Sequence, residues 1–116
     1  MKKIAVAVIC LFALIVFPSR ISAAGVSVID GFKISSKEEL HAKLSRDLNF
    51  PSHYGNNLDA LYDALSTEKE STVIKVINVD ILKKKLGKKY VDGFLTAVSD
   101  ASDDNAKVVL IFASKI

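Results

Sequence analysis

The 116-residue chain is half hydrophobic and one quarter charged, which suits one small domain with a single hydrophobic core. Its 16 basic side chains outnumber its 13 acidic ones, but Lys2, Lys3 and Arg20 precede residue 25 and no acidic residue does. Residues 25–116 therefore carry 13 basic and 13 acidic side chains. This balance argues against a protein that binds nucleic acid by neutralising its phosphates.

The first 24 residues have the organisation of a secretory signal peptide. Two lysines give a positive start, residues 4–17 form an unbroken apolar run, and Ser22-Ala23-Ala24 supplies small residues for a signal peptidase. The run of fourteen residues is shorter than the roughly 20 that a helix needs to cross a bilayer. We therefore predict cleavage after Ala24, with Ala23 as the alternative, and a periplasmic or secreted domain over residues 25–116.

The mature chain begins with a predicted strand at residues 26–29, followed by a turn at Asp30-Gly31. Ser36 and Glu39, three residues apart, have the spacing of a capping box, in which each caps the other's backbone. A helix is therefore predicted to open directly after Ser36.

Leu40, Leu44 and Leu48 recur every four residues and give this helix one apolar stripe. Pro51 prevents the helix from continuing far beyond residue 49. His41 lies beside the stripe, and no second histidine, cysteine or carboxylate stands at ligand spacing on its face. We expect a surface or half-packed histidine there rather than a metal ligand.

Residues 51–65 are the most informative segment of the chain. Pro51 fixes its own φ, and Gly55 allows backbone conformations closed to other residues, so a loop is predicted. Asn56 or Asn57 can accept hydrogen bonds from the first free N–H groups of a helix, which should begin there. The helix has an apolar stripe at i, i+3, i+4 and i+7, formed by Leu58, Leu61, Tyr62 and Leu65.

Two aspartates share a neighbouring face of this helix. Asp59 and Asp63 are one turn apart and repel each other by roughly 0.2–0.5 kcal/mol, and Tyr62 lies at the border between them and the apolar stripe. No lysine or arginine stands three or four residues from either aspartate. The pattern is consistent with a merely solvated acidic face, or with a surface that meets a positively charged molecule.

The segment HYGNNLDALYDAL, at residues 53–65, resembles the barstar family, small protein inhibitors of barnase-type ribonucleases. The motif fixes a glycine, an asparagine, two aspartates and three leucines at set distances. The likeness is dense over residues 50–65, and its order and spacing extend from about Val26 to Ser114. The resemblance implies an α/β fold in which a small three-stranded parallel sheet is packed with about four helices.

The second half of the chain agrees with that architecture. After a polar loop at residues 66–71, residues 72–79 are rich in β-branched side chains and apolar at both parities, which predicts a strand covered on both faces. Asp80 can cap a short helix that ends at Leu86, before Gly87.

A second apolar stripe with helical spacing, at Val91, Phe94, Leu95 and Val98, predicts a helix from about Lys88 to Ala101. A polar loop at residues 102–105 and an apolar strand at residues 108–112 complete the chain. Strands separated by helices indicate parallel pairing.

The resemblance implies a role for each position of the central motif. Asp63 would be the deepest anchor in the catalytic cleft of the nuclease, and Asp59 the second acidic contact. Tyr62 and His53 stand where the family carries a tryptophan and a tyrosine. The other implied contacts are Tyr54, Gly55, Asn57 and Leu58 around the helix start, and Asp100 in place of a glutamate on the later helix. Core packing is the preferred role for Tyr54, and partner contact for Tyr62.

The chain departs from the family's pattern in three ways. A second tryptophan, just past the central helix, has no equivalent at residues 66–69. His53 replaces an aromatic hydroxyl with a group that can titrate near neutral pH. The predicted signal peptide would direct the chain out of the cell, whereas barstar acts inside the cell that makes the nuclease.

We therefore expect an exported, monomeric inhibitor that occludes the active site of a periplasmic or extracellular ribonuclease and acts as an immunity protein. It would have no catalytic residue, cofactor or metal, no direct contact with nucleic acid and no stable membrane insertion. One alternative is a barstar-fold adaptor or immunity protein that binds a different basic protein. Another is a small hydrolase built on His53, Asp59 and Asp63, although no nucleophile elbow, phosphate loop or paired-histidine motif accompanies them.

Overall fold

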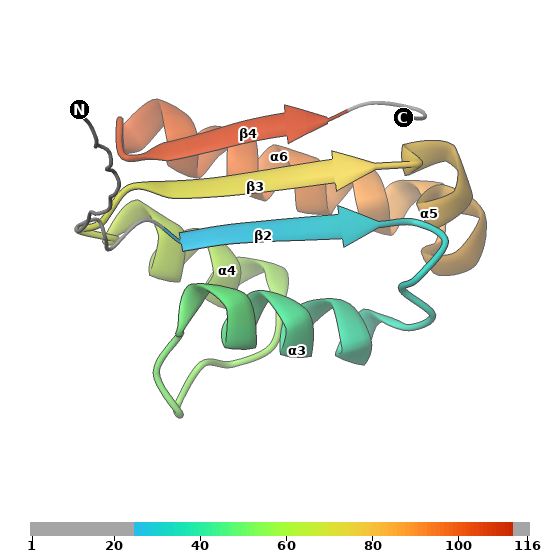
Figure 1. Ribbon diagram of the computed structural model, residues 1–116, viewed down its shortest axis with the longest axis horizontal. Coiled ribbons are helices and arrows are strands. Elements are labelled where there is room, and N and C mark those ends of the chain that lie inside the picture. Colours follow the sequence, from blue (N-terminus) through green and yellow to red (C-terminus); the bar gives the residue numbers. More distant parts are fainter. Residues whose placement is uncertain (1–24, 113–116) are drawn as a thin grey trace, which may run out of the picture.

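The computed structural model describes residues 25–112, so the signal peptide predicted at residues 1–24 lies outside the described part of the chain. Three parallel strands form one sheet in the order β2 (Gly25–Asp30), β3 (Thr72–Ile77) and β4 (Val108–Phe112) (Figure 1). The parallel pairing predicted from the alternation of strands and helices is confirmed.

Within this region, four helices make the two crossovers. The connection from β2 to β3 contains α3 (Lys37–Leu48) and α4 (Leu58–Ser66), and that from β3 to β4 contains α5 (Val79–Leu86) and α6 (Lys88–Asp104). The three-stranded parallel sheet and its helices agree with the barstar-like α/β fold that the sequence predicts.

The helices cover one face of the sheet. Alternate strand residues that face the helices are buried, among them Ile29, Ile74 and Val108. Both crossovers step in the same direction across the sheet, and because parallel crossovers are right-handed, their helices lie on the same side. The opposite face stays open, and its exposed apolar residues are Val26, Val28, Val109 and Ile111.

The prediction that the strand at residues 72–79 is covered on both faces is therefore wrong. On the open face Val73 is half-buried, and Lys75 is exposed between Val28 and Ile111 of the neighbouring strands. β-branched residues at both parities are typical of a doubly covered strand, but the second layer of helices is missing from residues 25–112.

Three boundaries in the second half also differ from those predicted. β3 ends at Ile77, because Asn78 takes the left-handed conformation (φ 54°) and donates its side-chain amide to Asp30 Oδ1 at 2.9 Å. The predicted cap residue, Asp80, instead lies in the first turn of α5. The helix predicted to end at Ala101 continues to Asp104, through most of the expected loop.

The N-terminus of α3 forms as the sequence predicts. The Ser36 hydroxyl accepts a hydrogen bond from the Glu39 N–H at 3.1 Å. The Glu39 carboxylate reaches back to the N–H of Ser35 at 2.7 Å, one residue earlier than in a standard capping box. One of the N–H groups that a helix start leaves unpaired, that of Glu39, is thus satisfied together with the N–H just before the cap, and Leu40 and Leu44 are directed into the core.

A Ser36→Ala substitution is expected to lower the free energy of unfolding by about 1 kcal/mol, because it removes this N-cap. Urea denaturation of the variant measures the loss. Ser35→Ala is the matched control, since the exposed Ser35 contributes to the cap only through its backbone. Equal stabilities for the two variants would show that the Ser36 hydroxyl does not stabilise α3.

Candidate functional site

The acidic helix α4 begins at Asn57. The side-chain oxygen of Asn57 accepts a hydrogen bond from the Ala60 N–H at 2.8 Å, and its amide donates to the Gly55 carbonyl at 3.2 Å. The residue with positive φ in this loop is Asn56 (56°), not Gly55. Gly55 is required for close approach instead, since a Cβ there would lie 3.2 Å from the Ala60 Cβ.

The apolar stripe of α4 determines where its aspartates point. Leu61 and Leu65 are fully buried in the core, which turns the opposite side of the helix to solvent. Asp59 and Asp63 are both exposed there. Among residues 25–112, neither carboxylate forms an ion pair or accepts a hydrogen bond. Both carboxylates are therefore available to a binding partner.

A third carboxylate meets these two across a groove between α4 and α6. Asp100, on α6, lines this groove together with Asp59, Asp63 and Tyr62. The groove has a volume of about 530 Å³. Gly93 of α6 lies opposite the start of α4, where a Cβ would come within 3.1 Å of Leu58 Cδ1. The absence of a side chain at Gly93 thus allows α4 and α6 to approach closely.

The Tyr62 hydroxyl donates a hydrogen bond to the carboxylate of Asp104, in the last turn of α6. This bond, together with the nearby negative charges of Asp104, Asp100 and Asp63, raises the pKa of the Tyr62 phenol. Sequence analysis missed Asp104, and no local pattern could have found it, because the two residues are 42 positions apart.

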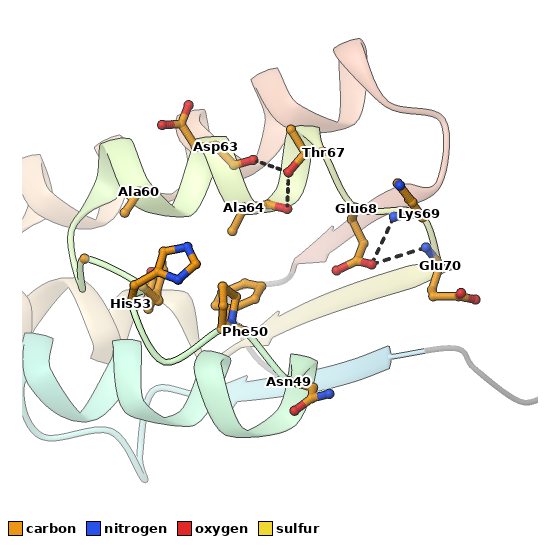
Figure 2. Close-up of a pocket in the computed structure, with 13 residues that line it drawn as sticks. Asn49, Phe50, His53, Ala60, Asp63, Ala64, Thr67, Glu68, Lys69 and Glu70 are labelled. Carbon is orange, nitrogen blue, oxygen red and sulfur yellow. Dashed lines mark hydrogen bonds between the residues drawn. The ribbon is translucent and has the colours of Figure 1, made fainter.

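The loop before α4 borders a second, larger cavity of about 750 Å³ (Figure 2). His53 and Phe50 lie on its loop side and Ala60 on its α4 side, while the carboxylate of Asp63 points out from α4 on the side away from Phe50. His53 is exposed at this cavity. The cavity also reaches Glu68, in the segment where the family's second tryptophan is missing.

The Tyr54 side chain points from the loop into the core rather than towards solvent. Its side chain is 9% exposed, and its ring packs against Phe50 with the ring centroids 4.8 Å apart. This burial agrees with the core-packing role preferred for Tyr54 and leaves the loop surface to His53, Gly55 and Asn57, all of which are exposed.

The prediction that His41 is a surface or half-packed residue is wrong. It is 2% exposed, and its two ring nitrogens each lie 2.7 Å from a tyrosine hydroxyl, Nδ1 from that of Tyr54 and Nε2 from that of Tyr90. His41 thus joins α3, the loop and α6. Burial lowers the pKa of its imidazole, although the nearby Glu38 charge opposes this effect. The spacing of His41 from Leu44 and Leu48 (i+3 and i+7) was the available signal for this position.

The C-terminal end of α4 is held by Asn105, which caps α6. The Asn105 amide donates to the carbonyls of Leu65 at 3.0 Å and Glu68 at 2.8 Å, and its side-chain oxygen accepts from the Lys107 N–H at 3.0 Å. The Leu65 carbonyl also accepts a hydrogen bond from the Glu68 N–H at 3.1 Å, so the Asn105 amide gives this carbonyl a second donor. The C-terminal end of α4 is therefore tied to the end of α6.

Neither a metal site nor a membrane span is found in the described part of the chain. Between residues 25 and 112, no three histidine, cysteine or acidic residues are grouped so that they could hold a metal ion. None of the helices in this range is both long enough and apolar enough to cross a bilayer.

Comparison with known proteins decides the family. The family model described as Barstar (barnase inhibitor) matches residues 25–113, which include every element described above. The chain belongs to the barstar family. Among curated proteins, one relative is named "Putative ribonuclease inhibitor YrdF" and comes from Bacillus subtilis (strain 168); it is 33% identical to this chain over 87 residues. These residues are 72% of this chain and 94% of the relative.

Membership of the barstar family confirms the resemblance seen at residues 53–65. The matching family model is described as a barnase inhibitor, which makes this a family of ribonuclease inhibitors.

Proposed function

We propose that this protein binds a barnase-type ribonuclease and occludes its active site, with the carboxylates of α4 in the positions of RNA phosphates. The observation that carries the proposal is the exposure of Asp59 and Asp63 without any charge partner among residues 25–112, with Asp100 across the same groove. A ribonuclease cleft is lined with cationic groups that hold phosphates, so its charge is complementary to this surface.

Charge determines both the strength and the speed of the proposed binding. Arginine can donate two parallel hydrogen bonds to one carboxylate, and such charge-assisted bonds are about twice as strong as neutral ones. A carboxylate is costly to remove from water unless an opposite charge meets it, which favours a complementary cleft over a neutral surface. Opposite charges also steer the two proteins together and raise the association rate.

In the proposed complex, Asp63 enters the cleft most deeply and Asp59 is the second acidic contact. Tyr62 supplies an aromatic surface between α4 and α6, and Asp100 contacts the nuclease at the periphery. The loop and helix start contribute contacts from His53, Gly55, Asn57 and Leu58. The buried Tyr54 packs in the core and anchors the loop there.

We further propose that the partner lies outside the cytoplasm. The organisation of residues 1–24 supports export of a monomeric domain to the periplasm or the medium, where it would meet a secreted or incoming ribonuclease. The protein would then act as an immunity protein against an extracellular nuclease, and would itself carry out no reaction.

A second candidate function is an adaptor that binds another basic protein. The observation that favours it is the cavity of about 750 Å³ beside Glu68, because the tryptophan that the family places in this segment is absent. An adaptor would keep the acidic surface but fit a partner with a different shape.

Titration of the purified protein into a barnase-type ribonuclease, with RNA cleavage as the readout, tests the proposal. We expect inhibition that is complete at a one-to-one ratio. Binding without inhibition would favour the adaptor, and absence of binding would contradict the inhibitor. RNA or ester hydrolysis by the protein alone, abolished by a chelator, would indicate the hydrolase instead.

A further inference from the structure

Tyr62 lies at the centre of the acidic surface, and its hydroxyl is held by a residue outside the family motif. The ring is half-buried between α4 and α6, and the hydroxyl donates to the Asp104 carboxylate. The groove lined by Asp59, Asp63 and Asp100 adjoins this ring. The orientation of the Tyr62 ring therefore affects the shape of the surface that a partner meets.

The backbone that carries Asp104 is itself held in place. The next residue, Asn105, is tied to the end of α4 through the carbonyls of Leu65 and Glu68, as described above. Because the last turn of α6 is fastened to α4 in this way, the Asp104 carboxylate has a defined position relative to Tyr62.

We propose that Asp104 is a positioning residue for partner binding, which holds the Tyr62 ring in its binding orientation. This inference rests on the proposed ribonuclease binding. A tyrosine without this hydrogen bond can rotate, and a partner must then order the side chain when it binds. The bond to Asp104 orders the ring before the partner arrives.

The neighbouring Asp103 separates this role from a simple effect of charge. Asp103 and Asp104 are consecutive, both are exposed and each carries one negative charge, but only Asp104 contacts Tyr62. Loss of either charge should slow association with a cationic ribonuclease to a similar extent. Only the loss of Asp104 should also free the Tyr62 ring and speed dissociation.

The first measurement needs no partner. The chain has three tyrosines and no tryptophan, so the ionisation of its phenols can be followed by ultraviolet absorbance, and the step that disappears in Tyr62→Phe belongs to Tyr62. In Asp104→Ala, this step is expected at lower pH than in the wild type, with a clearly smaller shift in Asp103→Ala. Equal shifts in the two variants would show that Tyr62 is not bonded to Asp104, and would overturn the inference.

The second measurement is the dissociation rate from a barnase-type ribonuclease, made on the protein produced from the full sequence. Asp104→Ala is expected to dissociate roughly three- to tenfold faster than Asp103→Ala, because this ratio corresponds to the cost of ordering one side chain on binding. In a Tyr62→Phe background, the two aspartate variants should dissociate at the same rate, because the hydroxyl that Asp104 holds is gone.

The outcomes distinguish this inference from the proposed function. If the wild type binds the ribonuclease and the two variants dissociate equally fast in both backgrounds, Asp104 does not position Tyr62 and the inference alone is wrong. If the wild type does not bind the ribonuclease at all, the proposed function is wrong, and the role of Asp104 in that binding is refuted with it.

Discussion

An Asp63→Ala variant is expected to inhibit a barnase-type ribonuclease at least thirtyfold less tightly than the wild type. Asp63 is exposed, carries no charge partner among residues 25–112 and lines both the groove between α4 and α6 and the larger cavity beside the loop. A side chain that anchors the centre of an interface typically contributes about 2 kcal/mol or more to binding, which corresponds to this ratio. The inhibition constant measured from RNA cleavage tests the expectation.

The stability of the free protein, unlike its inhibition of the ribonuclease, should not fall in Asp63→Ala. Asp59 and Asp63 repel each other across one helical turn, so removal of Asp63 should leave the free energy of unfolding unchanged or raise it by roughly 0.2–0.5 kcal/mol. A variant that is stable but inactive is typical of a residue retained for binding. Thermal unfolding of the free variant provides this second measurement.

Asp80→Ala is the matched control, because Asp80 is an exposed aspartate on α5 rather than on α4 or α6. It removes the same charge and should change the inhibition constant less than threefold, since a single charge outside the contact mainly alters steering. If Asp63→Ala and Asp80→Ala weaken inhibition equally, α4 does not enter the nuclease cleft.

A His41→Ala variant is expected to lose about 2–4 kcal/mol of folding stability at pH 8. The substitution leaves a cavity under the loop and removes the partner of two tyrosine hydroxyls, those of Tyr54 and Tyr90, which are 2.7 Å from the ring. The free energy of unfolding, measured by urea denaturation, gives the loss. The variant should also lose part of the pH dependence of the wild type.

The sign of that pH dependence follows from the lowered pKa of His41. A neutral imidazole has one N–H donor and one acceptor, so it can accept from one tyrosine hydroxyl and donate to the other. A proton on the buried ring would force both hydroxyls to accept. The folded protein therefore binds this proton less tightly than the unfolded chain, whose histidine has the ordinary pKa of 6.5.

His41 thus contributes stability that is fully present above pH 6.5 and is lost as the pH falls towards the lower pKa of the folded state. Asp30, Asp47 and Asp92, whose pKa values lie below the ordinary 3.8, affect stability only at more acidic pH. Unfolding measured between pH 5 and pH 8 should therefore show a slope in the wild type that is absent from His41→Ala.

His53 provides the control, because it is the other histidine of the chain and is exposed. His53→Ala should change the unfolding free energy by less than about 0.5 kcal/mol and keep the slope of the wild type. A slope that disappears with His53, or persists without His41, would contradict the assignment to the buried ring.

Local features of the fold could be read from the sequence because they depend on residues close together in the chain. The cap at Ser36, the start of α4 at Asn57 and the buried stripe of Leu61 and Leu65 each arise from contacts within one or two helical turns. Boundaries were wrong where a distant partner acts: the bond from Asn78 to Asp30 spans 48 positions, and it ends the strand earlier than its composition suggests.

The residues of the candidate site also fall into those that one helix predicts and those that only helix packing brings together. Asp59, Tyr62 and Asp63 could be assigned from one helix, because their spacing alone places them on adjoining faces. The hydrogen bonds of His41 to Tyr90 and of Tyr62 to Asp104 could not, because they depend on how α3 and α4 pack against α6.

The sequence by itself determined the class of the fold, the family motif and the acidic helix, since short-range patterning and turn chemistry are sufficient for these. Only the tertiary structure decided that one sheet face stays open, that His41 is buried, and that Asp104 stands beside Tyr62 of α4. Packing brings together residues whose separation in the chain carries no periodic signal, so their contacts become visible only once the helices are placed on the sheet.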